Sequence, residues 1–362
     1  MTAMNQADTA YTVEPLHVPA DADGPDAADF RTMIEIRNRV VSLVLGEQAQ
    51  IVTPHQALPA WQDDSDEETI GFLVRADVQP IGRALLYLPT EEGSTVAEPH
   101  IEIVPEHQGR GAGRLAFARL EQTAREHGRT TLQSWTNHRQ LGGERLTAST
   151  GWGSIPVGHV SRSLLAAGYA LGQVYRASAL DLTASMDRIV ELRDAAQAAA
   201  PGYRYVSWGL PTPPDRREGF ARMKARMSTD APAGDISFEE ETWDAARIER
   251  LDARLAAQGF TRLLGAIEHI DTGELVAYNE LVHIGAPDAN TTQMDTLVLK
   301  EHRGHRLGML VKCENLLRWR ELMPQSPRVT TNNAEENRPM LDINEAMGFA
   351  PIAYAGAWQK LL

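Results

Sequence analysis

Two glycine-containing segments of this chain have the composition of a phosphate-binding loop. In residues 102–115 a β-type run ends, Gly109, Gly111 and Gly113 follow at alternating positions, and an amphipathic helical pattern begins. Glycine removes the Cβ atoms that would separate a ligand from the backbone amides, and a helix N-terminus adds partial positive charge. Such a loop can hold a diphosphate against bare backbone.

The same pattern returns in residues 298–310. Both segments contain Glu-His-(Gln/Arg)-Gly-(Arg/His)-x-x-Gly, beginning at Glu106 and at Glu301, 195 residues apart. Two such loops predict a duplicated domain. A dinucleotide is a poorer fit as ligand, because that loop opens a parallel sheet and here several strands precede it. The predicted phosphate-binding residues are Gln108, Gly109, Arg110, Gly111, Ala112, Gly113 and Arg114, and then Arg303, Gly304, His305, Arg306, Leu307 and Gly308.

The elements around the loops follow the same order twice. Apolar periodicity predicts strand, helices, strands, loop, helix, strand, helix and strand in each half. The first half has expected strands at 11–18, 70–76, 81–88, 97–104, 131–136 and 174–182, and expected helices at 25–45, 113–126 and 160–167. The second has expected strands at 203–210, 263–269, 275–284, 294–299, 328–331 and 352–358, and expected helices at 213–227, 243–258, 308–320 and 339–347. We therefore predict one domain in 1–182, a connector helix in 183–200 and a second domain in 201–362.

Composition narrows the class of partner. The chain of 362 residues has a net charge of −14, which disfavours nucleic acid because its phosphates would be repelled. Cys313 is the single cysteine, so an intramolecular disulfide and a cysteine-based zinc site are excluded. The sequence also lacks a His-Glu-x-x-His motif, so no histidine-based metal site is indicated. The sequence contains no apolar run of membrane-spanning length and no apolar signal core at its start. We expect a cytoplasmic monomer or homodimer without a metal.

The first loop and its context resemble the GNAT superfamily of acetyl-CoA-dependent N-acetyltransferases. The family signature (Gln/Arg)-x-x-Gly-x-(Gly/Ala) is matched by Gln108, Gly111 and Gly113, and in part by Arg303 and Gly308, with Arg306 in place of the middle glycine. The element order fits over nearly the whole chain. The chain resembles the tandem, mycothiol synthase-like GNATs of actinobacteria.

A second family motif supports the resemblance in the second half. Asn337, Met340 and Ile343 precede Gly348-Phe349, as in the helix that follows the fifth strand of the family. Asn344 stands where the family often has a tyrosine that protonates the leaving thiolate. An amide cannot release a proton near neutral pH, so Asn344 cannot act as that acid.

The resemblance implies a fold and a set of contacts. The fold is α/β (α+β), with two tandem domains, each a mixed and mainly antiparallel sheet flanked by helices and splayed between strands four and five. Asn337 is implied to contact the pantetheine of acetyl-CoA. Amides that would hold the pantetheine and polarise the thioester belong to Ile103, Val104, Val298 and Leu299.

Amine acetylation also requires a base. Acidic residues on the strands facing the thioester are Glu98 and Glu102 in the first half and Glu280 and Asp295 in the second. The first half has the more complete loop, and the second half has the more complete helix motif. We predict the second half as catalytic, with Glu280, Asp295 and Asn344 at its site. The expected activity is acetyl transfer to a primary amine of a small polar molecule, and the alternative is a non-catalytic acyl-CoA-binding protein.

Overall fold

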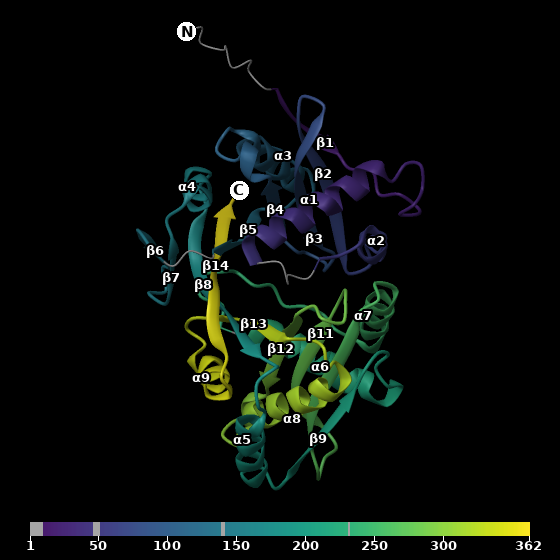
Figure 1. The fold of residues 1–362 in the computed structure, drawn as a ribbon, viewed down its shortest axis with the longest axis vertical. Coiled ribbons are helices and arrows are strands. Elements are labelled where there is room, and N and C mark those ends of the chain that lie inside the picture. The colour runs from purple at the N-terminus through teal and green to yellow at the C-terminus, as the bar shows by residue number, and fades with distance from the viewer. Residues whose placement is uncertain (1–9, 46–50, 139–141, 231) are drawn as a thin grey trace.

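The computed structural model describes residues 10–45, 51–138, 142–230 and 232–362, and shows two α/β halves joined side to side (Figure 1). No helix among these residues is long and apolar enough to cross a membrane. The N-terminal half lies at the top of Figure 1 and the C-terminal half below it. Two long strands, β8 and β14, run between them.

The N-terminal half follows the predicted order closely. Its α2 begins at Pro54 because Thr53 caps it: the Thr53 side chain accepts from the Gln56 N–H, and the Gln56 side chain accepts from the Thr53 N–H. The predicted irregular region before residue 158 contains a two-stranded hairpin, β6–β7. The elements are β1 Tyr11–Pro15, α1 Ala28–Leu45, α2 Pro54–Trp61, β2 Glu67–Ala76, β3 Gln79–Pro89, β4 Val96–Ile103, a 3-10 turn Pro105–His107, α3 Ala112–Glu126, β5 Thr131–His138, β6 Arg145–Thr147, β7 Ser154–Pro156, α4 His159–Ala166 and β8 Ala170–Asp181.

The C-terminal half repeats the series. A turn at Asp271-Thr-Gly273 joins β10 and β11 as a hairpin, and Asn337 caps α9 by accepting from the Met340 N–H at 3.4 Å. The elements are α5 Asp187–Ala198, β9 Tyr203–Trp208, α6 Pro214–Asp230, α7 Ala245–Ala257, β10 Thr261–His269, β11 Leu275–His283, β12 Thr291–Val298, a 3-10 turn Lys300–His302, α8 Leu307–Leu322, β13 Arg328–Ala334, α9 Arg338–Met347 and β14 Ala350–Leu361.

The two halves exchange their last strands. Twelve strands of the described chain form one sheet in the order β1-β2-β3-β4-β5-β14-β8-β13-β12-β11-β10-β9. The C-terminal strand β14 therefore pairs with β5 of the first half, and β8 pairs with β13 of the second. Trp358 of β14 is fully buried in the core of the N-terminal half, and its indole N–H donates to Thr136 at 2.9 Å. Each half thus depends on a strand from the other.

Each half also opens at the predicted place. The parallel strands β4 and β5 pair at only two positions, Val96 with Thr131 and Ala97 with Leu132, and then diverge. In the second half β12 and β13 pair only through Thr291 and Thr292 before diverging. The mixed α/β class and the predicted splay between strands four and five are confirmed.

Candidate active site

The first glycine loop forms an open cradle at the start of α3. Gly109 and Gly111 have φ angles of 72° and 99°, a region that favours glycine. A Cβ atom built on Gly109, Gly111 or Gly113 would meet no atom within 4 Å. The Gln108 side chain donates to the Ile103 carbonyl at 2.8 Å and fixes the loop to the end of β4. The backbone amides of this loop are therefore accessible to an anionic ligand.

A cavity of about 720 Å³ extends from this loop toward the divergence of β4 and β5. It lies between α3 and α4, and Lys360 of the exchanged strand β14 reaches its wall, where it pairs with Glu121 at 2.6 Å. Its lining includes His100, Ile101, Ile103, Gln108, Gly109, Arg110, Gly111, Gly113, Arg114, Phe117, Glu121, Ser134, Trp135, Thr136, His159, Ser163, Leu164 and Lys360. An elongated ligand with an anionic end fits this shape and charge.

Backbone amides of β4 face the opening between the strands. The Val104 N–H donates to the Ile81 carbonyl at 2.9 Å, so Val104 is bonded into the sheet with β3. In an antiparallel ladder the N–H groups of alternate residues turn the other way. The N–H groups of Ile103 and Ile101 therefore point toward the gap. Of the two predicted amides, Ile103 is placed to bind a ligand and Val104 is not.

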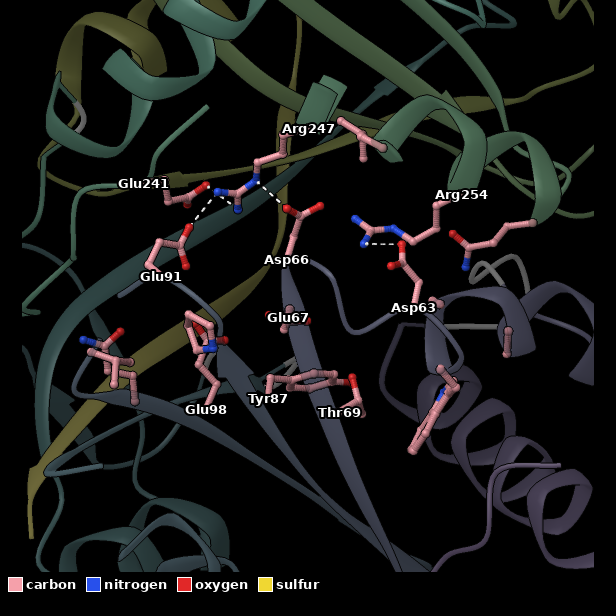
Figure 2. A pocket seen from close by; sticks show the side chains of 18 of the residues that line it. Asp63, Asp66, Glu67, Thr69, Tyr87, Glu91, Glu98, Glu241, Arg247 and Arg254 are labelled. Atoms are coloured by element: carbon pink, nitrogen blue, oxygen red, sulfur yellow. Dashed lines mark hydrogen bonds and ion pairs between the residues drawn. The ribbon is translucent and has the colours of Figure 1, made fainter. Parts of the chain in front are cut away.

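A second cavity, of about 570 Å³, lies on the opposite face of the same strands (Figure 2). Val96 and Glu98 of β4 and Gln133 of β5 line it, whereas Ile101 and Ser134, further along these strands, line the first cavity. Its floor is formed by β2, β3 and β4, and its far wall by residues 238–241 and helix α7 of the C-terminal half. The two cavities are thus neighbours at the splay, one on each face of the sheet.

The two acidic residues of β4 have opposite environments. Glu102 pairs with Arg83 and with His100, and although burial opposes it, these partners hold the pKa of Glu102 at about 2. Glu98 makes no ion pair among the described residues. Burial, and then the nearby carboxylates of Glu67 and Glu241, raise the pKa of Glu98 to about 7. Of the two, Glu98 is the one able to exchange a proton near neutral pH.

The C-terminal half is fixed over the second cavity by polar contacts. The Glu239 carboxylate accepts from the Thr95 N–H at 2.8 Å and from the Ser94 hydroxyl at 2.5 Å. The Ser237 carbonyl accepts from the Gln133 side chain at 2.9 Å. The segment between α6 and α7 is therefore a built wall of the cavity.

The second glycine loop has a closed counterpart of the first cavity. Arg306 adopts φ 55° at the position of the missing glycine, and a Cβ on Gly308 would lie 3.1 Å from the Ile343 side chain. Asn344 is 1% exposed; it accepts from the Lys312 ammonium and donates to Asn333 at 2.7 Å. The space between α8 and α9 that corresponds to the first cavity is occupied by these side chains.

The acidic candidates of the second half lie against cations inside the protein, and burial still raises the pKa of Glu280 above its ordinary value. The Lys224 ammonium lies 2.6 Å from Asp295, and although burial opposes it, Lys224 lowers the pKa of Asp295. Glu280 is buried and lies 3.7 Å from the Arg262 guanidinium. Glu280 and Asp295 therefore lie beside their own cations. The side chain of Asn344 on α9 has other hydrogen-bond partners, Lys312 and Asn333.

The β4 carboxylate has no equivalent in β12. With the offset of 195 residues, Glu98 corresponds to Gln293. A bulge adds one residue to β12 opposite Glu280 and shifts the strand register by one. When the two halves are compared by strand pairing, Glu98 therefore corresponds to Thr292. Neither residue has a carboxyl group.

The remaining predicted residues have these positions. Arg303 donates to the Val298 carbonyl at 3.1 Å, as Gln108 does to Ile103, and Leu307 is buried. The Leu299 N–H is bonded to the Val276 carbonyl, so the N–H of Val298 is the one directed at the gap in β12. Residues missed by sequence analysis are the walls of the second cavity, Glu67, Arg247 and Glu241 among them; no local motif marks them.

Comparison with known proteins agrees with this geometry. Residues 41–146 match the Acetyltransferase (GNAT) family. No curated protein matches the chain significantly. Among solved structures, a tandem GNAT protein from the clavulanic acid biosynthesis pathway is 23% identical, with a TM-score of 0.73 over 97% of this chain and 98% of that chain. A GCN5-related N-acetyltransferase from Sphaerobacter thermophilus is 12% identical, with a TM-score of 0.58 over 97% and 95%.

A fungal enzyme shares the fold over part of its length. The GCN5-related glucosamine N-acetyltransferase region of a multi-domain fungal β-N-acetylglucosaminidase is 11% identical, with a TM-score of 0.63 over 98% of this chain and 38% of that chain. The family match covers the loop, the splay and Glu98, and the fold match covers both halves. The N-terminal half therefore contains a match to the GNAT acetyltransferase family at residues 41–146, and the chain as a whole has the fold of tandem GNAT proteins.

Proposed function

We propose that this protein is an acetyl-CoA-dependent N-acetyltransferase whose N-terminal half performs the reaction on a primary amine. The observation that carries the proposal is the pair of cavities at the splay of β4 and β5, with an open diphosphate cradle in one and Glu98 in the other. The assignment to the N-terminal half departs from the expectation drawn from the helix motif of the second half. The filled space around Asn344 and Gly308 supports the change.

The residues of the first cavity fit acetyl-CoA. The amides of the loop at Gly109–Gly113 and the N-terminus of α3 would hold the diphosphate, with Arg110 and Arg114 beside it. The outward N–H groups of Ile101 and Ile103 would hold the pantetheine along β4. When bound, acetyl-CoA supplies an acyl group activated as a thioester.

Glu98 would prepare the amine. An amine enters the second cavity mostly as an ammonium, because its ordinary pKa is above 10. A carboxylate at the end of that cavity first attracts the ammonium and then accepts its proton, and a pKa of about 7 lets Glu98 do both near neutral pH. The uncharged nitrogen is then free to attack. The leaving thiolate, with a solution pKa of about 8.5, needs little help from an acid.

The test is the release of free CoA thiol from acetyl-CoA in the presence of a panel of amines. Wild-type protein is expected to turn over, and Glu98→Gln to lose at least a hundredfold in kcat/KM while it still binds acetyl-CoA in calorimetric titration. Glu102→Gln is unsuitable as a control because Glu102 holds Arg83; Glu68→Gln, on the same sheet and exposed, is the matched control. Binding of acetyl-CoA without turnover with any amine would favour the non-catalytic alternative instead.

A further inference from the structure

The second cavity has more carboxyl groups than cations. Its lining has eight acidic residues, Asp63, Asp66, Glu67, Glu91, Glu98, Glu239, Glu240 and Glu241, against four arginines, Arg37, Arg83, Arg247 and Arg254. This imbalance alone does not identify a ligand, because acidic surfaces are common. The distribution of the ion pairs within the cavity is more informative.

The cations of the cavity are already engaged. Arg247 contacts three carboxylates: Glu91 at 2.6 Å, Asp66 at 3.6 Å and Glu241 at 3.5 Å (Figure 2). Arg254 lies 3.7 Å from Asp63. Arg83 pairs with Glu102, on the same face of the sheet. The wall contributed by the C-terminal half is thus fixed mainly by ion pairs with carboxylates of the N-terminal half.

Two carboxylates on the floor have no such partner. Among the described residues neither Glu98 nor Glu67 forms an ion pair within 4.0 Å, and the charge of Glu67 raises the pKa of Glu98. Glu67 is exposed, and Arg254 and Arg247 attract its carboxylate from a greater distance. Strand register fixes their separation: Glu98 is opposite Tyr87, Tyr87 is opposite Thr69, and Glu67 is two residues from Thr69 on the same face. They stand two strands apart across the sheet and two residues apart along it, which places their Cα atoms roughly 12 Å from each other. Tyr87 lies beside them on the floor, with its ring directed toward Thr69 (Figure 2).

In the second half, by contrast, the buried carboxylates have ion-pair partners. There the buried acids Asp295 and Glu280 each contact a lysine or arginine of the same half. In the first half Glu98 lies at the end of an accessible cavity, beside the place where β4 and β5 part. A cation from solution can therefore reach Glu98, and Glu67 lines the same cavity.

We propose that the acceptor is an amine with a second cationic group, such as a linear aliphatic diamine, bound with its reacting nitrogen beside Glu98 and its other cation beside Glu67. This inference rests on the proposed function and names its substrate class. The alkyl chain would lie over the Tyr87 ring. The second cation relieves the repulsion between two carboxylates and remains protonated throughout the reaction.

The test compares three acceptors of equal carbon number. Butylamine ends in a methyl group, putrescine in an ammonium and γ-aminobutyrate in a carboxylate. With acetyl-CoA saturating, kcat/KM is expected to be at least tenfold higher for putrescine than for butylamine, and lowest for γ-aminobutyrate. Glu67→Gln should reduce the rate with putrescine and reduce the preference for putrescine over butylamine about tenfold. Glu68→Gln, an exposed neighbour on the other face of β2, should change neither.

The outcomes distinguish the proposed acceptor class from the proposed acetyltransferase activity. Equal rates with all three acceptors, a preference for γ-aminobutyrate, or an equal loss with all acceptors in Glu67→Gln would overturn the inference and leave amine acetylation standing. Absence of thiol release with every amine would overturn the proposed function, and this inference with it.

Discussion

Glu98→Gln is expected to make the protein more stable and less active at the same time. The folded structure raises the pKa of Glu98 from 4.5 to about 7, chiefly by burial. Between these two pH values the folded protein keeps a proton that the unfolded chain releases, so the free energy of unfolding falls as pH rises. Below pH 4.5 both states are protonated and the carboxyl group carries no penalty.

The size of the effect follows from the shift. Each pKa unit corresponds to 1.36 kcal/mol, so a shift of about 2.5 units costs on the order of 3 kcal/mol of stability above pH 7. Glutamine has nearly the same shape and no charge, and therefore removes this cost. Glu98→Gln should be about 2–3 kcal/mol more stable than wild type at pH 8 and equal to it near pH 4.5.

Urea denaturation at a series of pH values measures this difference directly. Glu68→Gln serves as the control, because its exposed carboxyl group should give no pH-dependent gain. The kinetic part is the loss of at least a hundredfold in acetyl transfer. A stability difference between Glu98→Gln and wild type that does not change between pH 4.5 and 8 would refute the argument that Glu98 is a buried, unpaired acid.

Three further outcomes are expected. Gly113→Glu places a carboxylate in the first turn of α3, where it favours the helix but repels a diphosphate. Calorimetric titration should therefore show at least a hundredfold weaker binding of acetyl-CoA, with an unchanged Tm. The control Arg306→Glu, in the second loop, should bind acetyl-CoA normally, and the reverse pattern would assign the cofactor to the second half. Trp358→Ala should lower the free energy of unfolding by about 3–5 kcal/mol, because it removes a buried indole from the core of the N-terminal half. Hydrogen-exchange protection of amides in the N-terminal half should fall, although Trp358 is near the C-terminus. A loss of protection confined to the second half would contradict the strand exchange. Asn344→Ala removes the side-chain oxygen that accepts from the buried Lys312, and should lower the free energy of unfolding by about 1–3 kcal/mol. The rate of acetyl transfer should be almost unchanged. A folded variant that is a thousand-fold slower would show that Asn344 belongs to the active site.

The sequence alone determined the local structure. The repeat at Glu106 and Glu301, the glycines of the first loop and the apolar periodicity predicted both halves, because turns, caps and amphipathic faces are encoded in neighbouring residues. The splay was implied by the family resemblance. Glu98 was identified as a candidate base, as were Glu102, Glu280 and Asp295. Sequence could not rank these four, because the charge state of a carboxyl group depends on partners that are distant in the chain.

Tertiary structure decided the rest. The exchange of β8 and β14 has no local signal, since a strand with the same alternation can pair in either half. The motif at Asn337 and Asn344 is intact in sequence, and only packing against Lys312 and Gly308 shows its space to be filled. Likewise Arg247 and Glu241 reach the second cavity only because the C-terminal half folds against the first. The space in the second half is filled by contacts between residues 32 to 35 positions apart, whereas the wall of the second cavity depends on contacts more than a hundred positions apart.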